Sequence, residues 1–267
     1  MGKSYRLTAD IDLSDYIARN GGSWKSIGNE TTPFTGALDG DGHRITGLTI
    51  AAGSSNGESE GGLFGKIKDL EEIGITCIKN LGVEIAESGI HINNTIKYGG
   101  GIAAHCKKGI IINCYVTGGG IYGDAGNGTD NPRICLGGIS GRISGGIRNC
   151  YSTVDITATC SNNGILSGED GIYIGGIFGW GEYAYLYNCL TTGTLSSSIT
   201  NPSNSLGGCV GGVAGWGESG ETAYCLAANS GGLIAEINGG DQSLSKLNNI
   251  MGRYKYYYGT SGLYALA

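Results

Sequence analysis

Proline, charge and long apolar runs are all scarce in this sequence. Three prolines among 267 residues exclude a collagen-like chain, which needs a strict triplet rich in proline. Charged residues make up 15% and apolar residues 40%, so the composition is too apolar and too weakly charged for a disordered chain. The longest purely aliphatic run, Ile110–Ile112, is far shorter than the roughly 20 residues of a membrane-spanning helix, so we expect no membrane insertion.

The net charge and the first residues of the chain limit the binding partners and the cellular locations that we expect. A net charge of -6 offers no basic surface for phosphate backbones, so nucleic acid is not an expected partner. The first residues, Met1–Tyr5, hold no apolar export segment, which fits a cytoplasmic chain or the mature part of an exported one. Polar and glycine residues are spread evenly, which predicts a single domain over 1–267. Nine cysteines, an odd number, require no disulfide framework in a chain of this length.

Glycine, by contrast, is abundant, with 53 residues, and some of the glycines recur at nearly regular intervals. Five double-glycine segments align along the chain, and an aliphatic residue follows each of them. Their second glycines lie 39, 37, 38 and 36 residues apart. The second glycine and its successor are Gly62-Leu63, Gly101-Ile102, Gly138-Ile139, Gly176-Ile177 and Gly212-Val213. A period of this length indicates a repeat architecture.

The repeat predicts strands rather than helices. Each interior glycine costs a helix about 1 kcal/mol relative to alanine, and the apolar residues after each double glycine recur with a period of two. One unit cannot bury its own apolar face, whereas coils stacked about 4.8 Å apart pair each strand with its equivalents. We therefore predict an all-β, single-stranded parallel solenoid with one coil per 36–39 residues. Entry coils would occupy 1–60, five repeats 61–246, and a C-terminal cap or truncated coil 247–267.

Two neighbouring columns of equivalent residues follow the double glycines. In the first, the last four units place a cysteine twelve or thirteen residues after the second glycine, and Leu81 holds the nearest equivalent place in the first unit. We expect this column to be small apolar side chains in the core. The cysteines are Cys114, Cys150, Cys189 and Cys225. In the second column, the residue directly before each first-column position is asparagine in four units and Tyr224 in the fifth. The asparagines are Asn80, Asn113, Asn149 and Asn188. We predict a ladder in which each amide bonds the next coil, because buried amides need partners.

The first unit also carries a known motif. Gly62-Leu63-Phe64-Gly65 matches the GLUG motif, and later units hold relaxed copies, with Ala104 replacing the last glycine of the second unit. Upstream, segments 5–13, 24–28 and 34–43 resemble the entry region of the same proteins. The chain thus resembles GLUG-motif repeat proteins over nearly its whole length. The resemblance implies a right-handed parallel β-helix of a bacterial surface or secreted protein, of the adhesin-like kind also found beside the protease region of some immunoglobulin-cleaving enzymes.

The position four residues after the second glycine predicts a ligand-binding face. It holds Lys66, His105, Arg142, Trp180 and Trp216. Strand alternation places it opposite the aliphatic positions, and lysine and arginine are rarely buried unpaired. We therefore predict that Trp180 and Trp216 face outward as a flat platform for a glycan or a partner protein, with Arg142 beside them. Alternatively, the long loops 123–131, 162–171 and 197–205 fold back and cover both indoles.

Glu182 and Glu218 are the strongest catalytic candidates, since equal places one coil apart could bring their carboxylates within roughly 5 to 5.5 Å, as in retaining glycosidases. Solvated turn glutamates would have the same spacing, and no neighbour in sequence raises one pKa as an acid requires. Our first hypothesis is therefore a non-catalytic, exported, adhesin-like protein that binds a glycan or a protein. A polysaccharide lyase or glycosidase and a ligand-free structural spacer remain the alternatives, and the oligomeric state stays open.

No metal or cofactor is expected. Asp39-Gly40-Asp41-Gly42 suggests calcium, but the segment continues without further oxygen ligands, and a tight turn explains its glycines. The histidines His43, His91 and His105 lie in different units. The many Gly-x-Gly matches lack a following helix, so no nucleotide site is predicted. Tyrosines crowd the C-terminal segment as Tyr254, Tyr256, Tyr257, Tyr258 and Tyr264, and we interpret them as a cap over the solenoid end.

Overall fold

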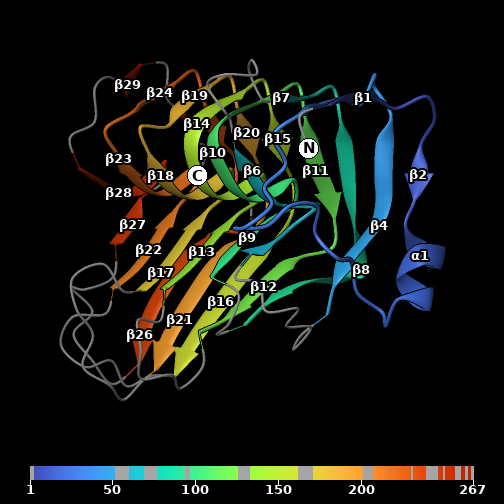
Figure 1. The fold of residues 1–267 in the computed structure, drawn as a ribbon. Helices are drawn as coiled ribbons and strands as arrows, with labels where there is room; N and C mark the ends of the chain where they lie inside the picture. Colours follow the sequence, from blue (N-terminus) through green and yellow to red (C-terminus); the bar gives the residue numbers. More distant parts are fainter. Residues whose placement is uncertain are drawn as a thin grey trace.

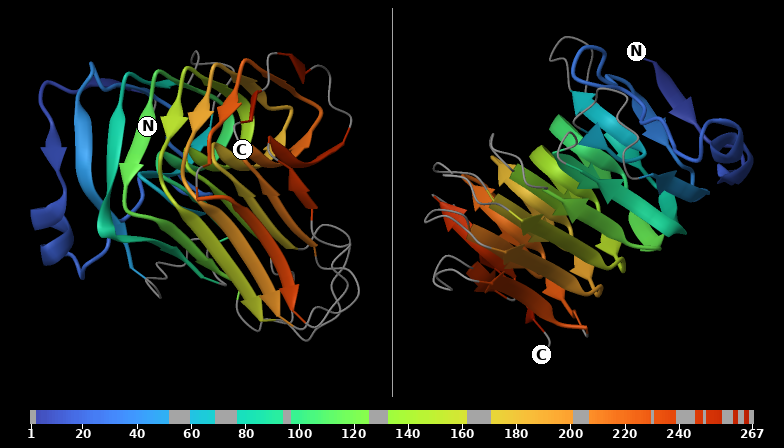
Figure 2. Two further views of the ribbon diagram at one scale, coloured as in Figure 1. Left: turned by 180° about the vertical axis from the view of Figure 1, so that it is seen from behind. Right: turned by 90° about the horizontal axis from the view of Figure 1, so that it is seen from below.

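The chain winds into a stack of parallel β coils, as the repeat predicts. The computed structural model describes residues 3–51, 60–68, 77–93, 97–125, 133–161, 171–200, 207–229, 231–238, 246–248, 250–255, 260–261 and 264–265. Figure 1 shows strands of successive coils lying side by side, and Figure 2 shows the coils following one another from the N-terminal to the C-terminal end. This arrangement confirms the parallel β-helix.

Three parallel sheets form the walls of the coil. In the part of the chain that the structure describes, sheets A and B contain 12 strands each, and sheet C contains 6. Sheet A consists of β1 (Ser4–Arg6), β3 (Ala37–Asp39), β6 (Phe64–Lys68), β7 (Cys77–Lys79), β10 (Ala103–Ile112), β14 (Ser140–Arg148), β18 (Phe178–Glu182), β19 (Tyr185–Tyr187), β23 (Ala214–Glu218), β24 (Glu221–Ala223), β28 (Met251–Lys255) and β29 (Thr260–Ser261).

Sheets B and C complete each turn of the coil. Sheet B consists of β2 (Ile11–Asp12), β4 (Arg44–Ile50), β8 (Gly82–Ile92), β11 (Tyr115–Gly118), β12 (Ile121–Asp124), β15 (Tyr151–Ser152), β16 (Ile156–Ser161), β20 (Leu190–Thr191), β21 (Leu195–Thr200), β25 (Leu226–Ala227), β26 (Leu233–Asn238) and β30 (Tyr264–Ala265). Sheet C consists of β5 (Glu60–Gly61), β9 (Tyr98–Gly100), β13 (Arg133–Gly137), β17 (Gly171–Gly175), β22 (Gly207–Gly211) and β27 (Lys246–Asn248). A short helix, α1 (Ser14–Arg19), lies beside β2 and β4 at the N-terminal end.

The double glycines form the bend that joins sheet C to sheet A. At three of these bends the second glycine, which is Gly101, Gly138 or Gly176, lies against a side chain from sheet B across the narrow interior. A Cβ at Gly138 would collide with Ser152 Oγ and the Gly176 carbonyl, and one at Gly176 would collide with Thr191 Oγ1. The glycines are therefore required by close packing through the centre of the coil.

Both predicted columns at the corner between sheets A and B are present. Leu81 and the four aligned cysteines are buried in the main core. All nine cysteines of the chain are free thiols. In the asparagine ladder, each Nδ2 donates to the Oδ1 of the preceding coil at 3.1 Å, from Asn113 to Asn80, Asn149 to Asn113 and Asn188 to Asn149. Asn80 itself donates to Asp39 Oδ1 at 3.0 Å.

The reason for the ladder differs from the one expected. Three of its amides are exposed rather than buried. All four asparagines have a left-handed backbone, with φ between 52° and 54°, and Tyr224 shares it at 55°. Asparagine tolerates this conformation better than other residues with a side chain, apart from aspartate and histidine. The corner geometry therefore selects asparagine, and the amide contacts between coils add to that preference.

Two further segments that stand out in the sequence are the acidic turn at residues 39–42 and the tyrosines of the predicted cap. Asp39 is held by Asn80, Lys79 and the Asp41 amide, and Asp41 by Arg6, so the acidic turn pairs with protein groups. Of the tyrosines in the predicted cap, Tyr264 is exposed at 65%. Tyr256, Tyr257 and Tyr258, and the side chain of Tyr254, lie outside the described residues, as do most of the loops predicted to cover the indoles.

Candidate functional site

The bend at the double glycines brings two outward-facing columns together. Along sheet A, the strand register aligns Lys66, His105, Arg142, Trp180 and Trp216, so the column predicted from the sequence is confirmed. Along sheet C, the register aligns a second column that consists of Glu60, Tyr98, Cys135, Tyr173 and Cys209. Because the chain turns sharply between the sheets, these columns form the two walls of a notch on the outside of the coil.

Trp180 and Trp216 fill the C-terminal half of this notch. They are 1% and 4% exposed and pack with Cys135, Tyr173 and Cys209 in a cluster separate from the main core. The column does face away from the coil interior, as predicted, but the prediction of an exposed tryptophan platform is wrong. Strands of sheet C cover the indoles, because the bend turns the outer face of one sheet onto the next. Neither indole is available to stack on a ligand.

The N-terminal half of the notch stays open and forms the outer groove. This cavity of about 610 Å³ is lined almost entirely by polar and charged side chains. The lining consists of Glu30, Glu60, Lys66, Lys97, Tyr98, His105, Lys107, Arg142, Ser144 and Glu182. Four of these residues are cations and three are carboxylates, so the outer groove carries one excess positive charge when His105 is neutral. It is the candidate functional site.

Lys66 lies at the N-terminal end of the outer groove. Its ammonium forms an ion pair with Glu30, which lies in the segment before β3. The lysine side chain is only 5% exposed, whereas that of Glu30 is 75% exposed. Burial, and then the positive charges of Lys107, Arg142 and Lys68, lower the pKa of Lys66 to about 8. The lysine is thus a buried cation within a positive environment.

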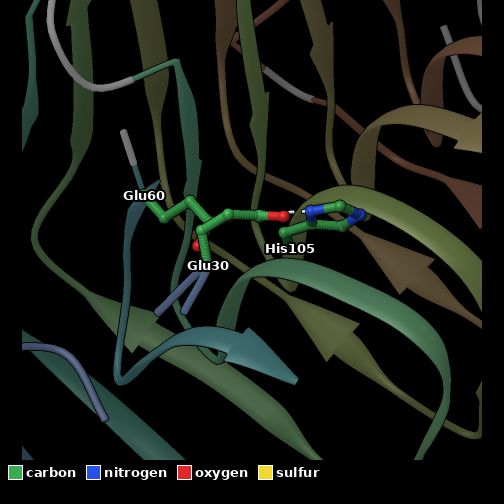
Figure 3. Close-up of side chains that lie close together, drawn as sticks. All are labelled: Glu30, Glu60 and His105. Carbon is green, nitrogen blue, oxygen red and sulfur yellow. Dashed lines mark hydrogen bonds and ion pairs between the residues drawn. The ribbon is translucent and has the colours of Figure 1, made fainter. Parts of the chain in front are cut away.

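His105 and Glu60 form a buried pair across the groove. Nδ1 of His105 lies 3.2 Å from Oε1 of Glu60, and the side chains are 9% and 3% exposed. Figure 3 shows the imidazole pointing one nitrogen at Glu60 and the other away from it. Burial and the charges of Lys66, Arg142 and Lys107 lower the pKa of His105 to about 3. A neutral ring that donates Nδ1–H to an ionised carboxylate leaves Nε2 as a hydrogen-bond acceptor.

Arg142 joins the two walls at the middle of the groove. It donates to Tyr98 Oη at 3.1 Å and to Glu182 Oε1 at 2.8 Å, and its guanidinium lies 5.6 Å from the centre of the Tyr98 ring. The Tyr98 ring in turn lies 5.6 Å from the His105 ring. Only two of the five N–H groups of Arg142 are used in these contacts, so it can also bind an acceptor in the groove.

Glu30, Glu60 and His105 also have the composition of a metal site. One ligand atom from each lies within 4.8 Å of the others. However, the Lys66 ammonium pairs with Glu30 beside this triangle, and Lys66, Arg142 and Lys107 all oppose protonation of His105. The same positive charges would repel a metal cation, and the Lys66 ammonium already provides the positive charge that pairs with the Glu30 carboxylate. The sequence prediction did not anticipate that these three residues meet.

Glu182 and Glu218 occupy equivalent places in adjacent strands, as predicted. Oε1 of Glu182 accepts from Arg142 at 2.8 Å and from Trp180 Nε1 at 3.1 Å. Glu182 therefore lies in an ion pair with Arg142 and positions its guanidinium in the groove.

Sequence reasoning identified one wall of the groove and missed the other. Tyr98, Cys135, Tyr173 and Cys209 lie two residues before the first glycine of their aligned pairs, so an alignment of that position would have revealed most of the second column. Glu60 lies only one residue before Gly61, and the strand register alone places it in this column. Glu30 lies outside the repeat, so no periodic signal marks it. His43 and His91 lie elsewhere, His43 against Asp10 and His91 against Tyr122.

Comparisons with known proteins show local sequence similarity and a shared fold. No protein-family model matches the chain. A stretch of 70 residues, 24% of the chain, is 46% identical to halomucin of Haloquadratum walsbyi. Another match of 66 residues, 25% of the chain, is 39% identical to an Evansella cellulosilytica protein named "Putative Gly-rich membrane protein". The chain spans only 1% and 7% of the length of these two relatives.

The structural comparison covers nearly the whole chain. A solved structure from Bacteroides ovatus, described as a "putative immunoglobulin A1 protease", matches with a TM-score of 0.59 and 20% identity. The match covers 99% of this chain and 78% of that chain. At this identity the similarity shows the fold, a β-solenoid. Within the described residues, no helix has the length and apolar character needed to cross a membrane.

Proposed function

We propose that this chain is a non-catalytic recognition module of an exported bacterial protein, secreted or at the cell surface, and that it binds a glycan in the outer groove. The observation that carries this proposal is the juxtaposition of Lys66, His105 and Arg142 along one wall, with Glu60 and Tyr98 opposite. Their backbones are fixed by the strand register, so hydrogen-bonding groups are presented on a rigid support. Preorganised groups of this kind lower the entropic cost of binding.

The shape and chemistry of the groove favour a glycan over a protein partner. A protein interface of standard size buries about 800 Å² on each partner and has an apolar centre with aromatic anchors. The outer groove is instead a concave cavity of about 610 Å³ with a polar lining, and the large aromatics beside it are buried. Such a site suits a narrow, hydroxyl-bearing chain.

The geometry favours binding over catalysis. The His105–Glu60 pair resembles the base and orienting carboxylate of a hydrolase, but a pKa of about 3 makes the imidazole a weak base. The protease activity in the name of the Bacteroides ovatus protein is therefore not extended to this chain.

An exported location is compatible with the cysteines and with one relative. Eight of the nine free thiols are buried, and burial raises the pKa of Cys106 and Cys135 to about 12. Buried thiols with a high pKa react slowly, so an oxidising environment would leave these two intact. The match to a protein named as a Gly-rich membrane protein also supports a location at the cell envelope.

A glycan array with matched arginine variants tests the proposal. Arg142→Gln removes the cation in the middle of the groove, while Arg148→Gln removes an exposed arginine on the same strand that lies over the Tyr187 ring instead. We expect the parent protein and the Arg148 variant to bind the same glycans and the Arg142 variant to lose them. Absence of binding by the parent, or equal binding by both variants, would contradict a glycan site in the groove.

A further inference from the structure

We propose that Glu30 is an internal stand-in for a ligand carboxylate, and that the outer groove binds an acidic sugar whose carboxylate displaces Glu30 from Lys66. This inference rests on the proposed function and specifies its ligand. The structural basis is the unequal burial of the two partners in one ion pair, together with the hydrogen-bonding groups that surround the lysine.

The lysine is the fixed half of the pair. Lys66 belongs to β6, pairs in register with His105 on β10, and is 5% exposed at its side chain. Glu30 lies outside the named strands and is 75% exposed, so most of its carboxylate already faces water. Because Glu30 is already largely hydrated, its carboxylate can return to solvent when another carboxylate pairs with Lys66. A carboxylate arriving from solvent would take its place on an ammonium that does not move.

The charge around Lys66 favours a second anion. Lys107 and Arg142 line the same groove, and their charges oppose that of Lys66. Glu182 partly neutralises Arg142, and Glu60 faces His105. An added carboxylate would relieve the repulsion among the cations, whereas a metal ion would increase it. The favoured ligand is therefore negatively charged.

The remaining groups of the groove match hydroxyls. Nε2 of neutral His105 accepts a hydrogen bond. The hydroxyl of Ser144, two residues after Arg142 on the same strand, can donate or accept one. A small inorganic anion would use the cations alone. A ring that carries a carboxylate and several hydroxyls, the chemistry of a uronic acid, would use both sets of groups.

Titration calorimetry with acidic polysaccharides and neutral counterparts tests this inference. The probes are polygalacturonate, alginate and hyaluronan, each compared with its carboxyl-reduced form. Glu30→Gln removes the stand-in charge at an exposed position, and Lys66→Gln removes the fixed cation. Glu84→Gln is the matched control, because Glu84 is a half-exposed glutamate paired with Arg44 on a different sheet.

We expect Glu30→Gln to bind the acidic polymer about two- to fivefold more tightly than the parent, since no internal carboxylate competes. Lys66→Gln should bind at least about tenfold more weakly, and Glu84→Gln should match the parent. The carboxyl-reduced polymers should bind weakly and respond to neither groove variant. Because Glu30 is exposed, its variant remains informative even if replacement of Lys66 impairs folding.

Three results would overturn the inference, and the third has a different meaning from the first two. Carboxyl-reduced polymers that bind as tightly as the acidic ones, or a Glu30→Gln variant that binds no better than the parent, would refute the stand-in role while leaving a glycan site in the groove intact. Absence of binding to any glycan would refute the proposed function, and the inference would fall with it.

Discussion

Nδ1 of His105 lies 3.2 Å from Oε1 of Glu60, and this contact joins the two walls of the outer groove inside a buried pocket. Lys66, Lys107 and Arg142 approach the imidazole from sheet A, and the Tyr98 ring packs against it from sheet C. The loss of water on burial, and then the repulsion by these cations, lower the pKa of His105 to about 3. The folded protein holds this histidine neutral.

The low pKa of His105 makes stability depend on pH. Between about pH 6.5 and 3, the unfolded chain binds a proton at this residue and the folded chain does not, so the free energy of unfolding contributed by His105 falls as the solution is acidified. Urea denaturation should show the parent losing stability relative to His105→Gln from about pH 7 to about pH 4. The control His91→Gln lies outside the groove on β8, and its free energy of unfolding should change with pH in the same way as that of the parent. If the His105 variant also runs parallel, the imidazole is not held neutral.

Removing one rung of the asparagine ladder should destabilise the corner. Asn149→Ala places alanine at a φ of 53° and removes the contacts to Asn113 and Asn188. The left-handed backbone and the lost, solvent-exposed amide contacts together should cost about 1–2 kcal/mol in urea denaturation. Asn149→Gly, which tolerates this φ, should cost less than alanine. Equal stability of parent and alanine variant would show that the ladder is incidental.

The glycine bend should tolerate no side chain. Gly138→Ala would press a Cβ against Ser152 Oγ and the Gly176 carbonyl, and we expect a loss of about 3 kcal/mol or more. Gly146→Ala in the same coil is the control, because the nearest atom to its Cβ would be Ile110 Cγ2 at 3.7 Å. That variant should stay within about 1 kcal/mol of the parent. A mild effect at Gly138 would mean that the sheets can separate at the bend.

The repeat in the sequence was sufficient to predict which residues align. Because equivalent positions of a solenoid stack, the interval between double glycines predicted the register of Arg142, Trp180 and Trp216 correctly. It could not predict whether the indoles are exposed, since the angle between sheets C and A is set by the tight packing of glycines against sheet B. Glu30 reaches Lys66 from outside the repeat, so this half of the site depends on tertiary structure alone.

The groove is tested most directly by histidine NMR, since the chain has only three histidines, in separate places. We would titrate ¹⁵N-histidine-labelled protein with the glycan selected on the array. The ring nitrogens of His105 should shift as the sites fill, while those of His43, against Asp10, and His91, against Tyr122, stay unchanged. A glycan that binds and shifts His43 or His91, or none of the three, would show that the outer groove is not its site.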